Sequence, residues 1–154
     1  MRPFNLEEIM PDQRSAEGDA KPQISAAERD LLLEKARSVL EHAYAPYSKF
    51  HVGAAVLTEA GNIYVGCNVE NASYGLTNCA ERTAIFSAIA AEGPDARLRA
   101  VAVWNDPAGP CSPCGACRQV IFEMGPHSVV LFPGEQGRVV EVRASDLLPY
   151  GFSL

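Results

Sequence analysis

The chain lacks three features that would place it in large classes of proteins. It has no run of basic residues along the sequence. Its 13 lysine and arginine residues are also outnumbered by 19 aspartate and glutamate residues, which gives a net charge of -6. Proteins that bind a nucleic-acid polymer normally carry a basic surface, so no such partner is expected. No apolar stretch approaches the roughly 20 residues that span a bilayer, and the N-terminus has no export pattern. We therefore expect a cytoplasmic protein with no membrane partner and a small, uncharged ligand.

The chain also shows no internal repeat and no disulfide framework. Its five cysteines are an odd number and cluster in spacings typical of a metal site, which favours reduced thiols. A length of 154 residues suits one domain with a real core. We expect that domain over residues 25–154. Residues 1–24 are polar and rich in proline, which predicts a poorly ordered N-terminal extension; a strap over a neighbouring subunit is the alternative.

The periodicity of apolar residues predicts an α/β protein. Ser25 and Glu28 form a capping box that starts a helix of about five turns, ending near Tyr44. Two further helices are expected over 80–91 and 114–123, and five strands over 50–58, 63–67, 98–104, 128–132 and 139–142. This order predicts a three-layer α/β/α fold with a mixed five-stranded sheet between helices.

Three cysteines in two clusters carry the main chemical signal. Cys79 stands alone before an alanine-rich run, and Cys114 and Cys117 form a Cys-x-x-Cys pair. Three thiolates suit a zinc ion whose fourth position is open, as in catalytic sites. If Cys79 and Cys114 each start a helix, the helix dipoles stabilise both thiolates. Cys111 is a possible competing ligand, although a free thiol in a loop is the simpler interpretation.

A carboxyl group lies close to the first of these thiols in the sequence. Glu81 lies two residues after Cys79, and it suits proton transfer better than metal binding in a thiolate site. Cys-x-Glu followed by Pro-Cys-x-x-Cys is the layout of zinc deaminases, in which the glutamate is not a ligand. Arg82, next in the chain, is a candidate to hydrogen-bond the sulfurs; an ordinary surface arginine is the alternative.

Four segments extend this likeness to a family. They are Ala45–Ala55 (APYSKFHVGAA), Asn68–Arg82, Pro113–Gln119 (PCGACRQ) and Leu147–Phe152 (LLPYGF). In this order and spacing the chain resembles the small homotetrameric cytidine deaminases, from about Ser25 to its C-terminus. The resemblance implies a cytidine deaminase-like fold, one Zn2+ per subunit, a homotetramer whose active sites are shared between subunits, and a role in pyrimidine salvage.

The resemblance also implies the substrate contacts. Phe50 would pack near the pyrimidine, Asn68 and Glu70 would bind the ribose, and the backbone at Ala80 would contact the carbonyl of the base. From the residues alone, Phe50 is equally a core residue of a strand, and Asn68 and Glu70 are polar residues on one side of an extended segment. A carboxylate at Glu70 would repel a phosphate on the sugar, which favours a nucleoside over a nucleotide.

Three further residues receive roles by the same resemblance. Tyr74 and Phe152 resemble residues contributed across subunit boundaries, and Arg82 resembles the arginine that supports the metal site. Without the resemblance, Phe152 would be only a packing anchor near the C-terminus. If the matches hold, a monomer is inactive.

The predicted reaction is hydrolysis of a cyclic amidine C–N bond. Zinc-bound hydroxide attacks C4 of cytidine, and of 2'-deoxycytidine, and Glu81 shuttles the proton first to N3 and then to the amino group, which leaves as ammonia. Another aminated base or nucleoside analogue is a second possible substrate. Two non-deaminase hypotheses stay open: a small zinc-stabilised interaction protein, and disulfide exchange at Cys114 and Cys117.

Overall fold

The structure, a computed structural model, describes residues 24–153. The expected extension over residues 1–24 lies outside the described residues, except for Ile24. Four helices are present in the described part: α1 (Ala26–Ser38), α2 (Ala80–Glu92), α3 (Gly115–Met124) and the short α4 (Ala144–Leu147). The strands are β1 (His51–Thr58), β2 (Ile63–Cys67), β3 (Leu98–Asp106), β4 (Val129–Pro133) and β5 (Val139–Arg143).

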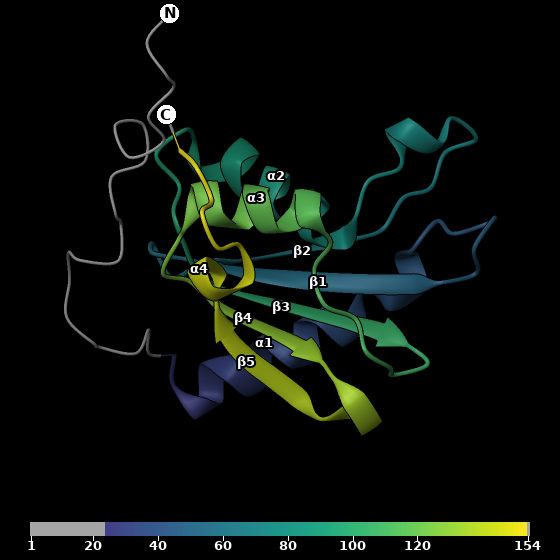
Figure 1. Cartoon of the computed structure of the whole chain (residues 1–154), viewed down its shortest axis with the longest axis horizontal. Coiled ribbons are helices and arrows are strands. Elements are labelled where there is room, and N and C mark those ends of the chain that lie inside the picture. Colours follow the sequence, from purple (N-terminus) through teal and green to yellow (C-terminus); the bar gives the residue numbers. More distant parts are fainter. Residues whose placement is uncertain (1–23, 154) are drawn as a thin grey trace, which may run out of the picture.

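The five strands form one mixed sheet in the order β2-β1-β3-β4-β5. Only β3 and β4 run parallel; the other neighbours are antiparallel. Helix α1 lies on one face of the sheet, and α2 and α3 lie on the other (Figure 1). The predicted three-layer α/β/α fold is therefore confirmed, and both helices expected to carry cysteines pack on the same face.

Strand β1 is buried on both faces because helices cover both. Val52, Ala54 and Val56 pack with the core beneath α2 and α3, whereas Ala55 and Leu57 pack with the core beneath α1. This division follows from the alternation of side chains along a strand. A strand covered on both faces shows a continuous apolar run rather than an apolar–polar alternation, and the sequence has that run.

Two glycines set how closely the helices approach the sheet. A Cβ atom on Gly53 would lie 2.0 Å from the carbonyl oxygen of Ala36 in α1, and one on Gly66 would lie 2.4 Å from the backbone nitrogen of Ala84 in α2. Neither position has room for a side chain. Gly66 therefore fixes the first half of α2 directly against β2, and with it the residues at the helix start.

Helix α1 is shorter than predicted. Its capping box between Ser25 and Glu28 is present as expected, but the helix ends at Ser38 and a single 3-10 turn follows over Leu40–His42. Tyr44 then runs beside the segment after β2, donating its N–H to the carbonyl of Asn68 and accepting from the N–H of Glu70. This pairing requires extended backbone, so it overrides the helical periodicity that continues through Ala43. None of the helices in residues 24–153 is long and apolar enough to cross a membrane.

Candidate active site

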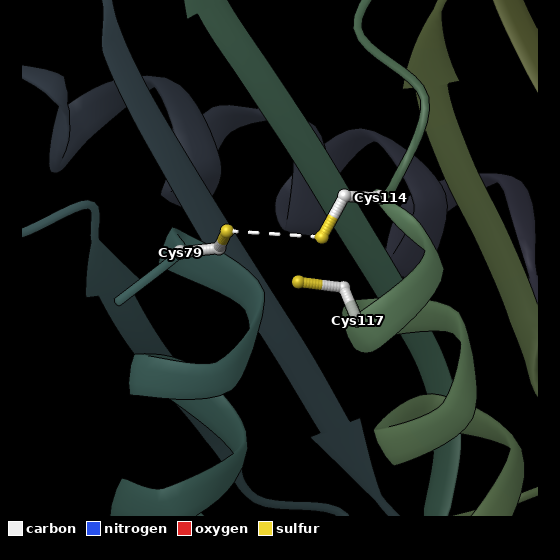
Figure 2. A group of neighbouring side chains, drawn as sticks. All are labelled: Cys79, Cys114 and Cys117. Carbon is white, nitrogen blue, oxygen red and sulfur yellow. Dashed lines mark hydrogen bonds between the residues drawn. The ribbon is translucent and has the colours of Figure 1, made fainter. Parts of the chain in front are cut away.

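Three thiols from two helix starts meet on the α2–α3 face of the sheet. Cys79 is the N-cap residue of α2 and Cys114 that of α3, while Cys117 lies in the first turn of α3. Figure 2 shows their side chains pointing toward one another across the gap between the helices. The Sγ atoms of Cys79 and Cys114 are 3.9 Å apart, and all three sulfurs lie within 4.8 Å of one another.

This spacing fits zinc. With Zn–S bonds of about 2.3 Å in tetrahedral geometry, two sulfurs on one ion lie roughly 3.8 Å apart, close to the observed separation of Cys79 and Cys114. The donors are soft, and they come from helix N-termini whose dipoles favour negative charge. Within residues 24–153 no histidine belongs to this group. The predicted zinc cofactor is thus confirmed by the thiol cluster together with the family described below.

Hydrogen bonds to its sulfur stabilise the thiolate form of Cys79. The pKa of the Cys79 thiol is lowered to about 5, chiefly because Cys117 donates a hydrogen bond to its sulfur and because Arg82 supplies a second bond and a positive charge. The same bond raises the pKa of Cys117, which holds the proton. The negative charge therefore lies on Cys79, and a cation bound among the sulfurs would replace the proton on Cys117.

Glu81 is buried beside the thiols. It lies in the first turn of α2 and is only 4% exposed. Removal from water raises the pKa of its carboxyl group above the ordinary value, and the nearby charge of Cys79 raises it further. Such a carboxyl group takes and gives up protons more readily near neutral pH than an exposed one. The adjacent Ala80 is fully buried.

Arg82 contacts the thiol cluster through its guanidinium group. Its Nη2 atom donates to the sulfur of Cys79 over 3.4 Å. Its Nε atom is buried without a hydrogen-bond partner among the described residues. The guanidinium group thus faces the sulfurs and offsets part of their negative charge.

Cys111 stands apart from this set. It does not belong to the group of three neighbouring sulfurs. Its N–H donates to the carbonyl of Pro133 at the end of β4, and its side chain packs against the core. Burial raises the pKa of its thiol to about 11, so it holds its proton at neutral pH. The alternative of a fourth thiolate ligand is not supported, and a structural zinc site with four protein ligands loses its only cysteine candidate.

The two predicted sugar contacts follow β2 in the chain and lie beside the segment that leads into β1. The side-chain oxygen of Asn68 accepts from Val52 N–H at 2.8 Å, and its amide donates to the carbonyl of Phe50 at 2.8 Å. The carboxylate of Glu70 accepts from Tyr47 N–H at 2.8 Å. Glu70 also lines a hollow of the surface, together with Tyr47, Ser48, Tyr74 and Thr77.

The remaining predicted contacts are exposed in the single chain. Phe50 is 41% exposed, Tyr74 79% and Phe152 61%. The ring of Tyr74 meets Tyr47 edge to face, with 6.3 Å between ring centroids. Gln119 in α3 donates to the carbonyl of Phe152 over 2.9 Å, which brings the end of the chain back to the helix that carries two of the thiols.

Sequence reasoning missed two residues that hold the site together. Arg118 donates from Nε to the carbonyl of Pro113, from Nη1 to the carbonyl of Leu147 and from Nη2 to Ser112 Oγ. It therefore ties the loop before Cys114 to the C-terminal segment. Ser48 bonds Glu70 and Phe50. Both residues lie inside the segments that carry the resemblance, but nothing in their spacing indicated these partners.

A buried carboxyl group two residues after one thiol of a three-sulfur site, on this fold, defines a zinc-dependent deaminase. Comparison with known proteins gives the family. The sequence profile described as the cytidine and deoxycytidylate deaminase zinc-binding region matches residues 27–132. The chain belongs to the cytidine deaminase family, whose members are zinc-dependent hydrolases.

Individual relatives agree with this assignment. The chain is 50% identical over 125 residues to a protein of Sporosarcina psychrophila named cytidine deaminase, covering 80% of this chain and 90% of that one. It is 47% identical over 127 residues to the cytidine deaminase of Halalkalibacterium halodurans, covering 82% and 95%. The crystal structure of cytidine deaminase from Burkholderia pseudomallei is similar, with a TM-score of 0.73, 50% identity and coverage of 84% and 100%.

Proposed function

We propose that the protein hydrolyses cytidine, and also 2'-deoxycytidine, to uridine or deoxyuridine and ammonia. The observation that carries this conclusion is the buried Glu81 beside three converging thiols at two helix N-termini. Similarity to proteins named cytidine deaminase at 47% and 50% identity supports the choice of nucleoside. The ribose contacts proposed below do not require a 2'-hydroxyl, which is why deoxycytidine is included.

In this proposal Cys79, Cys114 and Cys117 hold one Zn2+ per subunit. A zinc ion bound there supplies Lewis-acid activation of water at neutral pH. Glu81 takes a proton from the attacking water and gives it to N3 of the ring. Once the C4–O bond has formed, Glu81 takes the remaining proton of the new C4 hydroxyl and delivers it to the amino group. The C4–N bond then breaks and ammonia leaves, so both protons of the water are accounted for. Its burial supports this double role, since the raised pKa suits both uptake and release.

The proposed substrate contacts are those that the resemblance to the family implies, and one of them, Glu70, lines the hollow described above. Glu70 accepts a hydrogen bond from a sugar hydroxyl, and Asn68 contacts the sugar through the amide hydrogen that it does not donate to Phe50. Phe50 packs on the pyrimidine, and the backbone at Ala80 contacts the base carbonyl. A carboxylate at the sugar end would repel a phosphate group, so a nucleoside is favoured over a nucleotide.

We also propose a homotetramer with shared active sites. The exposure of Tyr74 and Phe152 supports this, because large aromatic side chains on the surface often mark interfaces. In the tetramer these residues would complete a neighbouring site. Five free cysteines suit a reducing compartment, which supports a cytoplasmic enzyme of pyrimidine salvage.

The proposal is tested by following the loss of ultraviolet absorbance of cytidine with the wild-type protein and with Glu81→Gln. The variant keeps the shape of the side chain and leaves the sulfurs untouched, so we expect full zinc content. Loss of proton transfer is expected to lower turnover by at least about a hundredfold. Glu34→Gln, an exposed change on α1 at the opposite face, is the matched control and is expected to be fully active.

Near-normal turnover by Glu81→Gln would refute the role of Glu81 without refuting the reaction. Absence of cytidine conversion by zinc-loaded wild-type protein would refute the substrate. Sedimentation of the active protein as a monomer would refute the shared site.

A further inference from the structure

One hydroxyl group links two of the proposed substrate contacts. Ser48 donates from Oγ to the Oε1 atom of Glu70, and the same Oγ accepts from the N–H of Phe50 at 3.0 Å. Glu70 and Phe50 are 20 positions apart in the chain, and in this proposal they meet different parts of the substrate, the sugar and the base. Ser48 has no place in the reaction described above.

The carboxylate of Glu70 is nearly saturated by the turn that contains Ser48. Besides the bond from the Ser48 hydroxyl, it accepts from Tyr47 N–H at 2.8 Å and from Ser48 N–H at 3.3 Å. An ionised carboxylate offers about four acceptor positions. Ser48 N–H lies 3.3 Å from both oxygens, so three donors make four contacts and hold the carboxylate in one orientation, on a side chain that lines the hollow with Tyr74 and Thr77. The same bonds lower the pKa of Glu70, the largest cause being the Ser48 hydroxyl, so the group stays ionised.

The base side of the pocket is held by the same arrangement. The N–H of Phe50 is bonded by Ser48, and its carbonyl accepts from the Asn68 amide. The two backbone groups of Phe50 are thus held by Ser48 and by Asn68. Ser48 also bonds Glu70, and Asn68 is itself one of the two proposed sugar contacts. The Ser48 hydroxyl therefore connects the carboxylate of Glu70 directly to the backbone of Phe50.

We propose that Ser48 is a positioning residue for sugar recognition, whose hydroxyl holds the Glu70 carboxylate in the orientation that meets a sugar hydroxyl while it bonds the N–H of Phe50. This inference rests on the sugar role proposed for Glu70. The turn does not depend on the hydroxyl alone, because Lys49 N–H also bonds the carbonyl of Ala45 at 3.1 Å. Removal of the hydroxyl is therefore expected to loosen the pocket more than the fold.

The test compares cytidine with 2',3'-dideoxycytidine, which lacks two sugar hydroxyls. Ser48→Ala is expected to lower kcat/KM about tenfold on cytidine, mainly through a higher KM. The loss on the dideoxy compound is expected to be less than about twofold, because the bond from the Asn68 amide to its carbonyl still holds Phe50. Ser48→Thr restores the hydroxyl and is expected to restore most of the loss. Ser38→Ala is the matched control, because it removes an exposed hydroxyl that bonds the carbonyl of Lys35 at the C-terminal end of α1.

Glu70→Gln separates the two proposals. If Glu70→Gln weakens both substrates equally, the sugar role of Glu70 fails and the role of Ser48 fails with it. If Glu70→Gln discriminates against cytidine but Ser48→Ala weakens both substrates equally, or if Ser48→Thr does not restore KM, only the role of Ser48 is overturned. Should Ser48→Ala not fold, Ser48→Cys keeps the shape with a weak donor, and the same selective rise in KM is expected.

Discussion

Replacement of Gly66 by alanine tests whether the contact between β2 and α2 sets the geometry of the active site. The added Cβ would lie 2.4 Å from the backbone nitrogen of Ala84 and 2.8 Å from the carbonyl oxygen of Ala80. Both atoms belong to the backbone of α2, so no side chain can swing away. The helix itself must move.

The size of that movement follows from the contacts. Ordinary van der Waals contact starts at 3.4 Å, so the 2.4 Å approach must open by about 1 Å. Helix α2 carries Cys79 and Glu81 at its start, whereas Cys114 and Cys117 belong to α3. A shift of about 1 Å in reacting groups lowers rates by roughly a hundredfold, and overpacking of this kind lowers the free energy of unfolding by roughly 1–3 kcal/mol.

Gly53→Ala provides the comparison that separates geometry from stability. Its Cβ would lie 2.0 Å from the carbonyl oxygen of Ala36, a worse overlap, but on the α1 face of the sheet away from the thiols. We expect at least as large a loss of stability and little loss of zinc or turnover in the folded fraction. Gly109→Ala, whose nearest neighbour would be 3.8 Å away, is expected to change neither.

The assays are zinc content after dialysis against a weak chelator, cytidine turnover per folded protein, and urea unfolding. Gly66→Ala is expected to lose both zinc affinity and turnover beyond the loss seen in Gly53→Ala. Equal zinc content and equal turnover in the two variants would refute the idea that the β2–α2 contact fixes the position of Cys79 and Glu81.

Two further predictions concern side chains outside the thiol cluster. Arg118→Met removes three hydrogen bonds that hold the loop before Cys114. We expect about tenfold weaker zinc binding in a chelator competition and a lower unfolding midpoint in urea. Unchanged zinc affinity would contradict this role of Arg118. Glu92 accepts from Thr58 and Asn62, and the Asn62 bond is the main cause that holds its pKa below the ordinary 4.5. The unfolded chain therefore binds the proton more tightly, so stabilisation by Glu92 is present above pH 4.5 and is lost as the pH falls through the lower folded value. Glu92→Gln is expected to be less stable than wild type at neutral pH, with a difference that shrinks in acid; a difference independent of pH would count against it.

Local chemistry in the sequence was enough to predict the kind of site. Capping at Ser25, the glycine and proline after α2 and the periodicity of the apolar runs depend on neighbours a few residues away. The Cys-x-x-Cys pair is local in the same sense, because residues three apart on a helix share a face. For these reasons the helix starts at Cys79 and Cys114, the mixed sheet and the zinc chemistry could all be predicted.

Only the tertiary structure decided which of these groups meet. Cys79 and Cys114 lie close together because α2 and α3 pack on the same face of the sheet. This is a result of strand order rather than of any local pattern. The exclusion of Cys111, and the bonds that Arg118 and Ser48 make to distant segments, likewise depend on how the loops fold back. Helix α1 ended early for the same reason, since pairing with the segment after β2 outweighed a periodicity that extends further. Periodicity reports which face of an element is buried, but contacts between segments are set by packing of the whole chain.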